Sequence, residues 1–323
     1  MKRYTPPFTI TPKILKLLQD IAKEGGILEG RKLVDIPLSL RRDNNIKTIQ
    51  ASLAIEGNTL TVDQITDLLD GKIVLGPAQD IVEVKNALQV YDSLLGFNPL
   101  DSDDLLRAHK ILKYSLVDEN GRWRTTDVGI LKSGKVSHVA PPSKRVPDLM
   151  LDLFQYIQKV DIPWILKACI FHYELEFIHP FQDGNGRMGR LWQQLLLIKA
   201  DPIFRYVPVE VLVKEHQKDY YRVLGESDAA GESTVFIEFS LEIILESMAD
   251  FSKIASKTQQ DSTSRLLFSR SRLQKEWFNR KDYMNIQRDI STATASRDLS
   301  FGVNNNVLYS KGQKNQMYYK FVE

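Results

Sequence analysis

Apolar residues recur every three or four positions along most of this 323-residue chain, which predicts a mainly α-helical protein. In the first hundred residues the predicted helices are Pro12 to about Lys23, Asp43–Ile55, Val62 to about Asp70 and Ile81–Leu95. A Gly25-Gly26 pair is expected to stop the first helix and Gly57 the second, since glycine is common just past helix ends. Thr61 has a side chain suited to capping the third helix.

The helical pattern continues through the middle of the chain with one interruption. Further helices are predicted at Asp103–Ser115, Val146–Val160, Trp164–Phe177, Arg187–Ile198, Val209–Leu224 and Phe236–Phe251. The interruption is a β-hairpin, in which the β-prone segments Val128–Leu131 and Val136–Val139 flank a turn that Gly134 would close. The expected fold is therefore a helical bundle with one short hairpin.

The last sixty residues differ from the rest in pattern and charge. After a polar linker at Gln259–Ser264, the expected elements are a helix at Asp282–Ile290, a turn at Ser291-Thr292, a helical segment at Ala293–Leu299 and a two-stranded wing around Gly312. This order resembles a small winged helix-turn-helix domain. Residues 264–323 hold eleven Lys and Arg against five Asp and Glu, a net charge of +6, whereas the rest carries −4. Such a unit permits DNA binding, although small winged-helix domains also serve in dimerisation or docking.

One segment, His179–Arg190, concentrates residues with chemical functions. Pro180 disfavours helical geometry at the residue before it, so His179 is expected in a loop, where it could act as a base. The segment Gly184-Asn185-Gly186 can direct backbone amides towards one point at the start of the next predicted helix. The free N–H groups of a helix N-terminus make such a position an anion site.

Charged side chains complete this candidate site. Arg187 and Arg190 are three residues apart and share a helix face, and their guanidinium groups suit phosphate oxygens. Asp183 supplies one carboxylate beside the anion site, as in proteins that hold Mg²⁺ on a nucleotide. Together these groups predict nucleotide transfer. A plainer interpretation stands beside it, namely an ordinary turn followed by arginines on a solvated helix face.

The order His-Pro-Phe-x-Asp-Gly-Asn-Gly-Arg-x-x-Arg resembles the signature of the Fic family (filamentation induced by cyclic AMP), with every fixed position filled. The resemblance implies a protein adenylyltransferase, which moves AMP from ATP to a Ser, Thr or Tyr hydroxyl of a target protein. It makes His179 the general base and Asp183 the Mg²⁺ ligand. It makes the following residues nucleotide-binding: Asp183, Gly184, Asn185, Gly186, Arg187, Met188, Gly189 and Arg190. Within this set, Arg187 would contact the β-phosphate and Arg190 the γ-phosphate.

Upstream, the segment Ser52-Leu53-Ala54-Ile55-Glu56-Gly57 resembles the inhibitory motif of the same family. Ser52 and Glu56 are four residues apart and so lie on one helical face. The resemblance places Glu56 against Arg190, where it would occupy the guanidinium group meant for the γ-phosphate. The plainer interpretation of Glu56 is a surface acid near a helix end, since most glutamates are exposed.

Two further sets of residues follow from the resemblance. The hairpin corresponds to a flap that holds the target by main-chain pairing, and it falls on Lys135, Val136, Ser137, His138 and Val139. Tyr220, Tyr221 and Asp228 correspond to the adenine side of the nucleotide pocket, with plain core positions as the alternative for the tyrosines. Apart from these sets, His109 and His172 are interpreted as packed histidines rather than metal ligands.

The predicted domain organisation has four parts. Residues 1–98 form an N-terminal helical region with the inhibitory helix at about 43–57, and residues 99–205 form the Fic catalytic core. Residues 206–258 form a helical extension that completes the nucleotide pocket, and residues 262–323 form the winged-helix domain.

Composition narrows the classes of function. The chain has 43% hydrophobic and 26% charged residues, as in soluble globular proteins, and a net charge of +2 is too small to imply a nucleic-acid or membrane partner for the whole chain. A single cysteine, Cys169, excludes an intrachain disulfide and, with no apolar signal segment, predicts a cytoplasmic protein. The expected co-substrate is ATP, the expected cofactor Mg²⁺ and the expected partner a target protein, with a homodimer left open.

Three alternatives stay open at this point. A Fic-type enzyme can instead remove AMP, with Glu56 orienting a water molecule and His179 protonating the leaving oxygen. It can also use another nucleotide or a phosphocholine donor. A function of another class is a DNA-binding regulator that acts through the C-terminal unit, with the core as a sensor.

Overall fold

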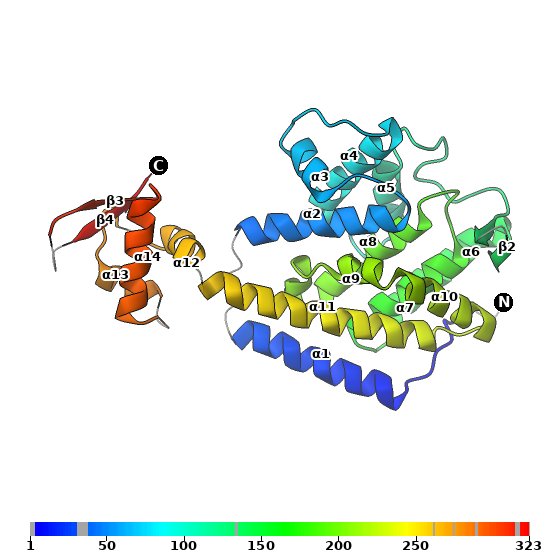
Figure 1. Cartoon of the computed structure of the whole chain (residues 1–323). Coiled ribbons are helices and arrows are strands. Elements are labelled where there is room, and N and C mark those ends of the chain that lie inside the picture. The colour runs from blue at the N-terminus through cyan, green and yellow to red at the C-terminus, as the bar shows by residue number, and fades with distance from the viewer. Residues whose placement is uncertain are drawn as a thin grey trace. The chain divides into compact units, whose positions relative to one another are not determined.

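The computed structural model describes residues 4–30, 38–132, 135–260, 262–273, 275–287, 290–313 and 317–322. The chain divides into two compact units, residues 1–26 with 42–249 and residues 27–41 with 250–323. The described part is mainly helical and contains two antiparallel hairpins, which confirms the predicted fold class (Figure 1).

The first unit contains most of the helices, and three of them (α1, α2 and α11) contribute residues to both units. The helices that enter the first unit are α1 (Pro12–Gly30), α2 (Leu38–Ile55), α3 (Val62–Leu69), α4 (Ala78–Asp92), η1 (Leu94–Gly96), α5 (Ser102–Leu112), η2 (Ser143–Arg145), α6 (Val146–Lys159), α7 (Trp164–Ile178), α8 (Asn185–Ala200), η3 (Pro202–Arg205), α9 (Val209–Glu215), α10 (Gln217–Ala230) and α11 (Thr234–Gln260). None of the helices among the described residues has the length and apolar character needed to cross a membrane.

Helices α7 and α8 form the centre of the first unit. Helix α4 packs on α5, α5 on α6 and α6 on α7, while α7 and α8 pack along each other (Figure 1). Cys169 and Phe171 on α7 and Leu191 and Trp192 on α8 are completely buried, because both helices are covered on more than one side. The loop between the buried ends of α7 and α8 is therefore held from both sides. This loop carries the segment from His179 to Gly184.

A hairpin of strands β1 (Gly129–Lys132) and β2 (Lys135–Val139) interrupts the helices between α5 and α6, as predicted. The strands pair antiparallel, with Gly129 opposite Val139 and an irregularity between Ile130 and Leu131. The predicted turn residue Gly134 lies outside the described residues. At the base of the hairpin the Thr126 hydroxyl donates to Oε1 of Gln182 at 2.9 Å, which ties it to the loop before α8.

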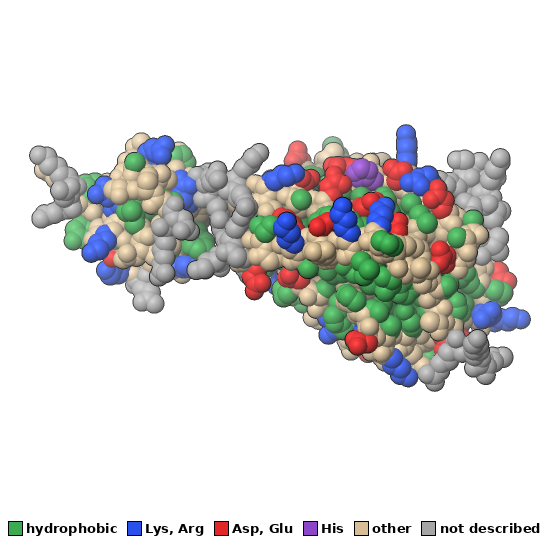
Figure 2. All heavy atoms as spheres, turned by 90° about the horizontal axis from the view of Figure 1, so that it is seen from below, with side chains coloured by type: hydrophobic (Ala, Val, Ile, Leu, Met, Phe, Trp, Pro, Cys, Tyr) green, Lys and Arg blue, Asp and Glu red, His purple; other side chains and the backbone are tan. Residues whose placement is uncertain are grey.

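The second unit contains α12 (Ser262–Arg270), α13 (Arg280–Ile286), α14 (Thr292–Asn304), β3 (Leu308–Lys311) and β4 (Tyr318–Phe321). Its core is formed by Leu266, Phe278, Tyr283, Ala295, Leu299 and Leu308. A buried ion pair joins α12 to α14, with Nη2 of Arg265 2.6 Å from Oδ1 of Asp298. The hairpin β3–β4 is antiparallel, and Gly312 after β3 has a φ of +99°. The face of this unit visible in Figure 2 carries many Lys and Arg side chains and few acidic ones. Its identity as a winged helix-turn-helix stays a prediction.

Several predicted element boundaries were wrong, and three of them have a clear physical reason. Helix α1 continues through Gly25 and Gly26 to Gly30, because a helical glycine costs only about 1 kcal/mol and the burial of Leu28 compensates for it. The segment predicted as one helix from Val209 is two helices that meet at His216, and the second of them includes Asp228.

The third wrong boundary is the polar linker predicted at Gln259–Ser264. Helix α11 continues to Gln260 and α12 begins at Ser262, while Asp261 lies outside the described residues. Ser262 gains a partner that its own sequence neighbours cannot supply, since its hydroxyl donates to Oδ1 of Asp298 at 2.7 Å. Polarity alone therefore gave the wrong prediction here, because a polar residue can pair within a folded unit.

Candidate active site

His179 lies directly after α7, in the loop that the following proline predicts. Its backbone is left-handed, with φ 50° and ψ 59°, a conformation that is uncommon for a residue other than glycine. The Nδ1 atom lies 3.3 Å from the carbonyl oxygen of Glu176. Because a carbonyl only accepts, Nδ1 carries the proton in this contact, and Nε2 of the neutral ring has the lone pair that a general base needs.

Arg124 holds the His179 loop in this conformation. Its side chain is completely buried, and its Nε donates to the carbonyl of His179 at 2.7 Å while its backbone N–H donates to that of Pro180 at 2.9 Å. The same guanidinium group donates to the carbonyls of Thr126 and Pro141 at 2.8 and 2.5 Å, on both sides of the hairpin. Sequence reasoning missed this role, since a lone arginine among turn residues carries no local signal of a long-range contact.

His109 and Asn185 also contact this loop and stabilise its conformation. The ring of His109 stacks on Phe181 with centroids 3.8 Å apart, its Nε2 lies 3.0 Å from the carbonyl of Asp183 and its Nδ1 accepts from the N–H of Gly121. Burial lowers the pKa of His109 to about 4, so the ring is neutral at physiological pH. The side chain of Asn185 bonds both backbone groups of Phe181, at 2.9 and 2.8 Å. The predicted packing role of His109 is confirmed.

The turn before α8 has the geometry of an anion site. Gly184 is the N-cap of α8 with a φ of +91°, which a residue with a Cβ rarely adopts. The first intrahelical hydrogen bond of this turn runs from the N–H of Met188 to the carbonyl of Gly184 at 2.9 Å. The N–H groups of positions 185, 186 and 187 precede it, so they have no partner within the helix and point out of its N-terminus.

Arg190 is paired with the residues of the predicted inhibitory segment. Its Nη2 lies 2.7 Å from Oε1 of Glu56 and 3.0 Å from the carbonyl of Ser52, and its Nε donates to Oγ of Ser52 at 3.1 Å. The side chain of Arg190 is 1% exposed and that of Glu56 is 28% exposed. The contact expected from the resemblance is therefore present, and it lies at the solvent-facing end of a buried guanidinium group.

Two glycines allow Glu56 to reach this position. A Cβ on Gly186 would collide with Oε1 of Glu56, so the carboxylate lies directly against the backbone of the candidate anion site. Gly57, which follows the end of α2, has a φ of +93° and its N–H donates to the carbonyl of Ala54 at 3.0 Å. The helix thus ends where predicted, and the turn aims Glu56 at the N-terminus of α8.

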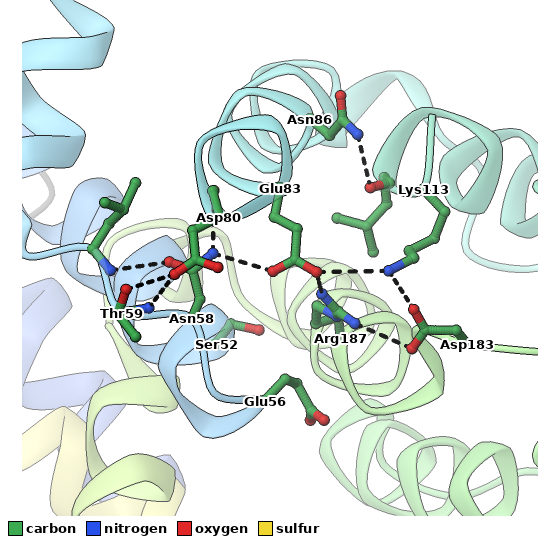
Figure 3. A network of polar contacts seen from close by, with 12 residues as sticks. Ser52, Glu56, Asn58, Thr59, Asp80, Glu83, Asn86, Lys113, Asp183 and Arg187 are labelled. Atoms are coloured by element: carbon green, nitrogen blue, oxygen red, sulfur yellow. Dashed lines mark hydrogen bonds and ion pairs between the residues drawn. The ribbon is translucent and has the colours of Figure 1, made fainter. Parts of the chain in front are cut away.

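Arg187 belongs to a second group of charges that sequence reasoning did not find (Figure 3). Its Nη1 lies 2.5 Å from Oε1 of Glu83 and its Nη2 3.2 Å from Oδ1 of Asp183. Lys113 contributes a second cation, with Nζ 2.5 Å from Oδ2 of Asp183 and 3.8 Å from Oε1 of Glu83. Asn58 donates to the other oxygen of Glu83 at 3.1 Å. Glu83 and Lys113 come from α4 and the end of α5, so only the packing of these helices brings them to the site.

The residues present fit a single Mg²⁺ held partly by a nucleotide. Burial raises the pKa of Asp183, but Lys113 and Arg187 outweigh this effect and lower it, so the carboxylate is ionised at neutral pH. Its side chain is 49% exposed, which leaves room for a ligand. No group of three or more His, Cys, Asp or Glu side chains among the described residues could hold a metal without help. One carboxylate with substrate phosphates is a usual Mg²⁺ site.

The predicted adenine-side residues take different positions. Tyr220 is 2% exposed and its hydroxyl lies 3.0 Å from Nε2 of His172, so it is a core residue in this structure. Tyr221 is half-buried, and its hydroxyl donates to the carbonyl of Ile55 at 3.4 Å, next to Glu56. Asp228 accepts from the hydroxyl of Tyr173 at 3.0 Å. Of the three, Tyr221 lies beside the predicted inhibitory segment.

Two further residues of the predicted nucleotide-binding set, Met188 and Gly189, are packed inside the protein. Met188 is completely buried, and a Cβ on Gly189 would meet the ring of His172, so both positions serve the packing of α8. His172 is itself buried: its Nδ1 donates to Oε1 of Gln193 at 2.6 Å, and its Nε2 accepts from the hydroxyl of Tyr220 at 3.0 Å. Burial lowers its pKa to about 3, which keeps the ring neutral and supports its interpretation as a packed histidine.

The comparison with known proteins agrees with this geometry. Residues 99–197 match the Fic/DOC family. A crystal structure of a Fic family protein from Desulfovibrio desulfuricans G20 is 38% identical, with a TM-score of 0.75 over 99% of this chain and 98% of that one. The chain belongs to the Fic/DOC family.

Other Fic proteins match part of the chain. A protein adenylyltransferase Fic of Nematostella vectensis is 30% identical over 248 residues, which cover 71% of this chain and 55% of the relative. The protein adenylyltransferase fic-1 of Caenorhabditis elegans is 27% identical over 244 residues, or 71% of this chain and 45% of the relative. The chain thus spans about half the length of these curated relatives. A solved structure of residues 134–508 of C. elegans Fic-1 has a TM-score of 0.60 at 22% identity over 75% of this chain and 73% of that one, and it shares the fold.

Proposed function

We propose that this Fic protein is a protein adenylyltransferase that moves AMP from ATP to a Ser, Thr or Tyr hydroxyl of another protein. The observation that carries the proposal is the position of Arg190, whose buried guanidinium group sits behind the α8 N-terminus and is paired with Glu56. The names of the curated relatives support the same activity. An arginine beside an anion site can bind the outer phosphates of a polyphosphate whose inner phosphates occupy that site.

His179 is the general base of the proposed reaction. The target hydroxyl oxygen attacks the α-phosphorus of ATP, its proton passes to Nε2 of His179, and the bond from the α-phosphorus to the bridging oxygen breaks to release pyrophosphate. The N–H groups at the start of α8 stabilise the charge that grows on the α-phosphate. Arg187 binds the β-phosphate and Arg190 the γ-phosphate. Met188, Gly189 and Tyr220 have packing roles in this scheme.

Asp183 is the residue that would hold Mg²⁺. Bound there, the metal would neutralise phosphate charge and orient the α- and β-phosphates. Strand β2 would hold the target segment, because among the described residues it pairs with β1 alone and its other edge has no strand partner, which suits main-chain pairing with an extended peptide. His138 then belongs to the docking strand and not to the catalytic set.

Glu56 keeps the enzyme inactive in this proposal. While its carboxylate occupies Nη2 of Arg190, the γ-phosphate has no counter-ion and ATP binds with its α-phosphorus out of line with the nucleophile. Replacing Glu56 by Gly should raise the transfer of label from α-labelled ATP to protein about tenfold or more, because a hydrogen bond to a charged group is worth about 1.5–3 kcal/mol. His179→Ala in the same background should lower transfer at least a hundredfold or so, since base catalysis contributes about that much.

Two outcomes of this experiment would contradict the proposal. If Glu56→Gly leaves labelling unchanged, Glu56 does not inhibit the enzyme. If labelling survives His179→Ala, His179 is not the general base. Release of free AMP from a purified AMP-modified target, with no labelling by either protein, would favour AMP removal instead. Competition by unlabelled nucleotides in the same assay identifies the donor.

A further inference from the structure

The ammonium group of Lys113 lies beside the candidate metal ligand and has no role in the proposed transfer. Its side chain is 1% exposed, and Nζ has no hydrogen-bond partner of suitable geometry in the described part of the chain. The negative charges of two carboxylates stabilise the buried ammonium group, because Nζ lies 2.5 Å from Asp183 and 3.8 Å from Glu83. A buried ammonium group is costly without such counter-ions.

Both carboxylate oxygens of Asp183 are therefore engaged by cations of the protein itself. Lys113 faces Oδ2, and Arg187 faces Oδ1 at 3.2 Å. The second carboxylate of the group, Glu83, is buried and already contacts Arg187 at 2.5 Å (Figure 3). Two positive and two negative charges balance, so a divalent cation added to Asp183 alone meets two like charges nearby.

We propose that Lys113 competes with the divalent metal for Asp183, and that Glu83 receives the ammonium group when the metal binds. The flexible lysine stem needs only a small rotation to exchange one carboxylate for the other, because Oε1 of Glu83 is already 3.8 Å from Nζ. The metal then binds weakly to the free protein and tightly once nucleotide phosphates add negative charge. Lys113 thereby couples metal binding to nucleotide binding. The inference rests on the proposed function in one respect, that Asp183 is the metal ligand.

The experiment measures Mn²⁺ binding to the full chain by electron paramagnetic resonance, without nucleotide and with ADP. ADP has no γ-phosphate, so the measurement does not depend on Arg190. Lys113→Met should lower the Mn²⁺ dissociation constant of the nucleotide-free protein about tenfold, because it removes one like charge close to the metal site. The further gain on adding ADP should be smaller in the variant than in the unaltered protein.

Matched variants separate charge from structure. Lys110→Met removes the same charge from an exposed position on the same helix and should leave Mn²⁺ binding unchanged. Glu83→Gln removes the receiving carboxylate and should weaken Mn²⁺ binding with ADP several-fold, opposite in sign to Lys113→Met. A structural role alone would move both variants in one direction, and thermal unfolding checks that each variant is folded.

Each result decides a different claim. Equal Mn²⁺ affinity of Lys113→Met and the unaltered protein, or a loss of affinity in both Lys113→Met and Glu83→Gln, overturns the inference and leaves the proposed function standing. If Asp183→Asn fails to weaken Mn²⁺ binding in either condition, Asp183 is not the ligand, and the metal part of the proposed function falls together with the inference.

Discussion

At the scale of single residues, the candidate site is governed by which carboxylate each arginine faces. Arg190 faces Glu56 and Arg187 faces Glu83, so each proposed phosphate-binding side chain has a carboxylate of the protein against it. The two pairs differ in exposure: the side chain of Glu56 is 28% exposed and that of Glu83 is 10% exposed. We therefore expect Glu56, rather than the more buried Glu83, to be the carboxylate that can move away from its arginine.

Glu56→Gln tests how much of the proposed inhibition by Glu56 is due to its negative charge. Glutamine keeps the size of the side chain and an oxygen that accepts from Nη2 of Arg190, but a neutral acceptor contributes about 1 kcal/mol rather than about 2. The initial rate of protein labelling from α-labelled ATP should therefore fall between that of the unaltered protein and that of Glu56→Gly. A Gln variant as active as the Gly variant would show that charge alone inhibits. One as inactive as the unaltered protein would show that steric occupation does.

At the scale of elements, α2, the proposed inhibitory helix, is held at its last turn. The carbonyl of Ile55 is among those that a helix end leaves without an intrahelical partner. It accepts from Nε2 of Gln217 at 2.9 Å and from the hydroxyl of Tyr221 at 3.4 Å, both on α10. Helix α10 therefore holds the residue that directly precedes Glu56, and we expect that weakening this contact lets Glu56 leave Arg190 more often.

Gln217→Ala should raise the labelling rate several-fold without touching the proposed phosphate-binding groups. Loss of the shorter hydrogen bond frees the end of α2 at a cost of about 1 kcal/mol, which raises the fraction of molecules with Glu56 displaced. The adjacent Lys218→Ala removes an exposed side chain and is the control, with no expected change. Equal rates for Gln217→Ala and the unaltered protein would show that α10 does not restrain the inhibitory segment.

At the scale of the whole molecule, ionisable groups buried between elements couple stability to pH. Glu174 on α7 is completely buried, and the hydroxyl of Tyr4 donates to its Oε2 at 3.0 Å. The N–H of Tyr4 also donates to Asp152 on α6 at 3.0 Å, so the N-terminal segment lies over this carboxyl group. Burial raises the pKa of Glu174 from 4.5 to about 8.

Glu174→Gln should change the pH dependence of thermal stability in a defined direction. With its pKa raised on folding, Glu174 contributes stability that is fully present below about pH 4.5 and is lost as pH rises through about 8, because the unfolded chain ionises first. The variant lacks this loss, so its melting temperature relative to the unaltered protein should increase between pH 5 and pH 8. Exposed Glu215→Gln is the control and should show no such trend. A difference that is constant with pH would contradict the assignment.

The two buried histidines affect the stability of the fold at acidic pH. The pKa of His109 is lowered to about 4 and that of His172 to about 3, so both stay neutral in the folded protein while the unfolded chain takes up protons below about 6.5. Stability is therefore lost as pH falls from about 6.5 towards these values. The histidines are the same in Glu174→Gln and in the unaltered protein, so their contribution cancels from the difference in melting temperature between the two proteins.

The sequence by itself determined the features that depend on near neighbours. The cap at Thr61, the stop at Gly57, the loop at His179 and the left-handed turn at Gly184 follow from the backbone preferences of these residues and of those beside them. The family signature also gave the Glu56–Arg190 contact, across 134 positions, as an expectation that local physics could not supply.

Only the tertiary structure decided which distant side chains complete the site. Glu83 meets Arg187 across 104 positions, and Arg124 meets His179 across 55. Such long-range partners cannot be predicted from a glutamate or an arginine in the sequence, because most charged side chains lie on the solvated surface. Packing also decided the end of α1. The pair Gly25-Gly26 predicts a helix end there, but the helix continues and buries Leu28. Backbone preferences act over a few residues, whereas burial and charge pairing depend on how the helices pack.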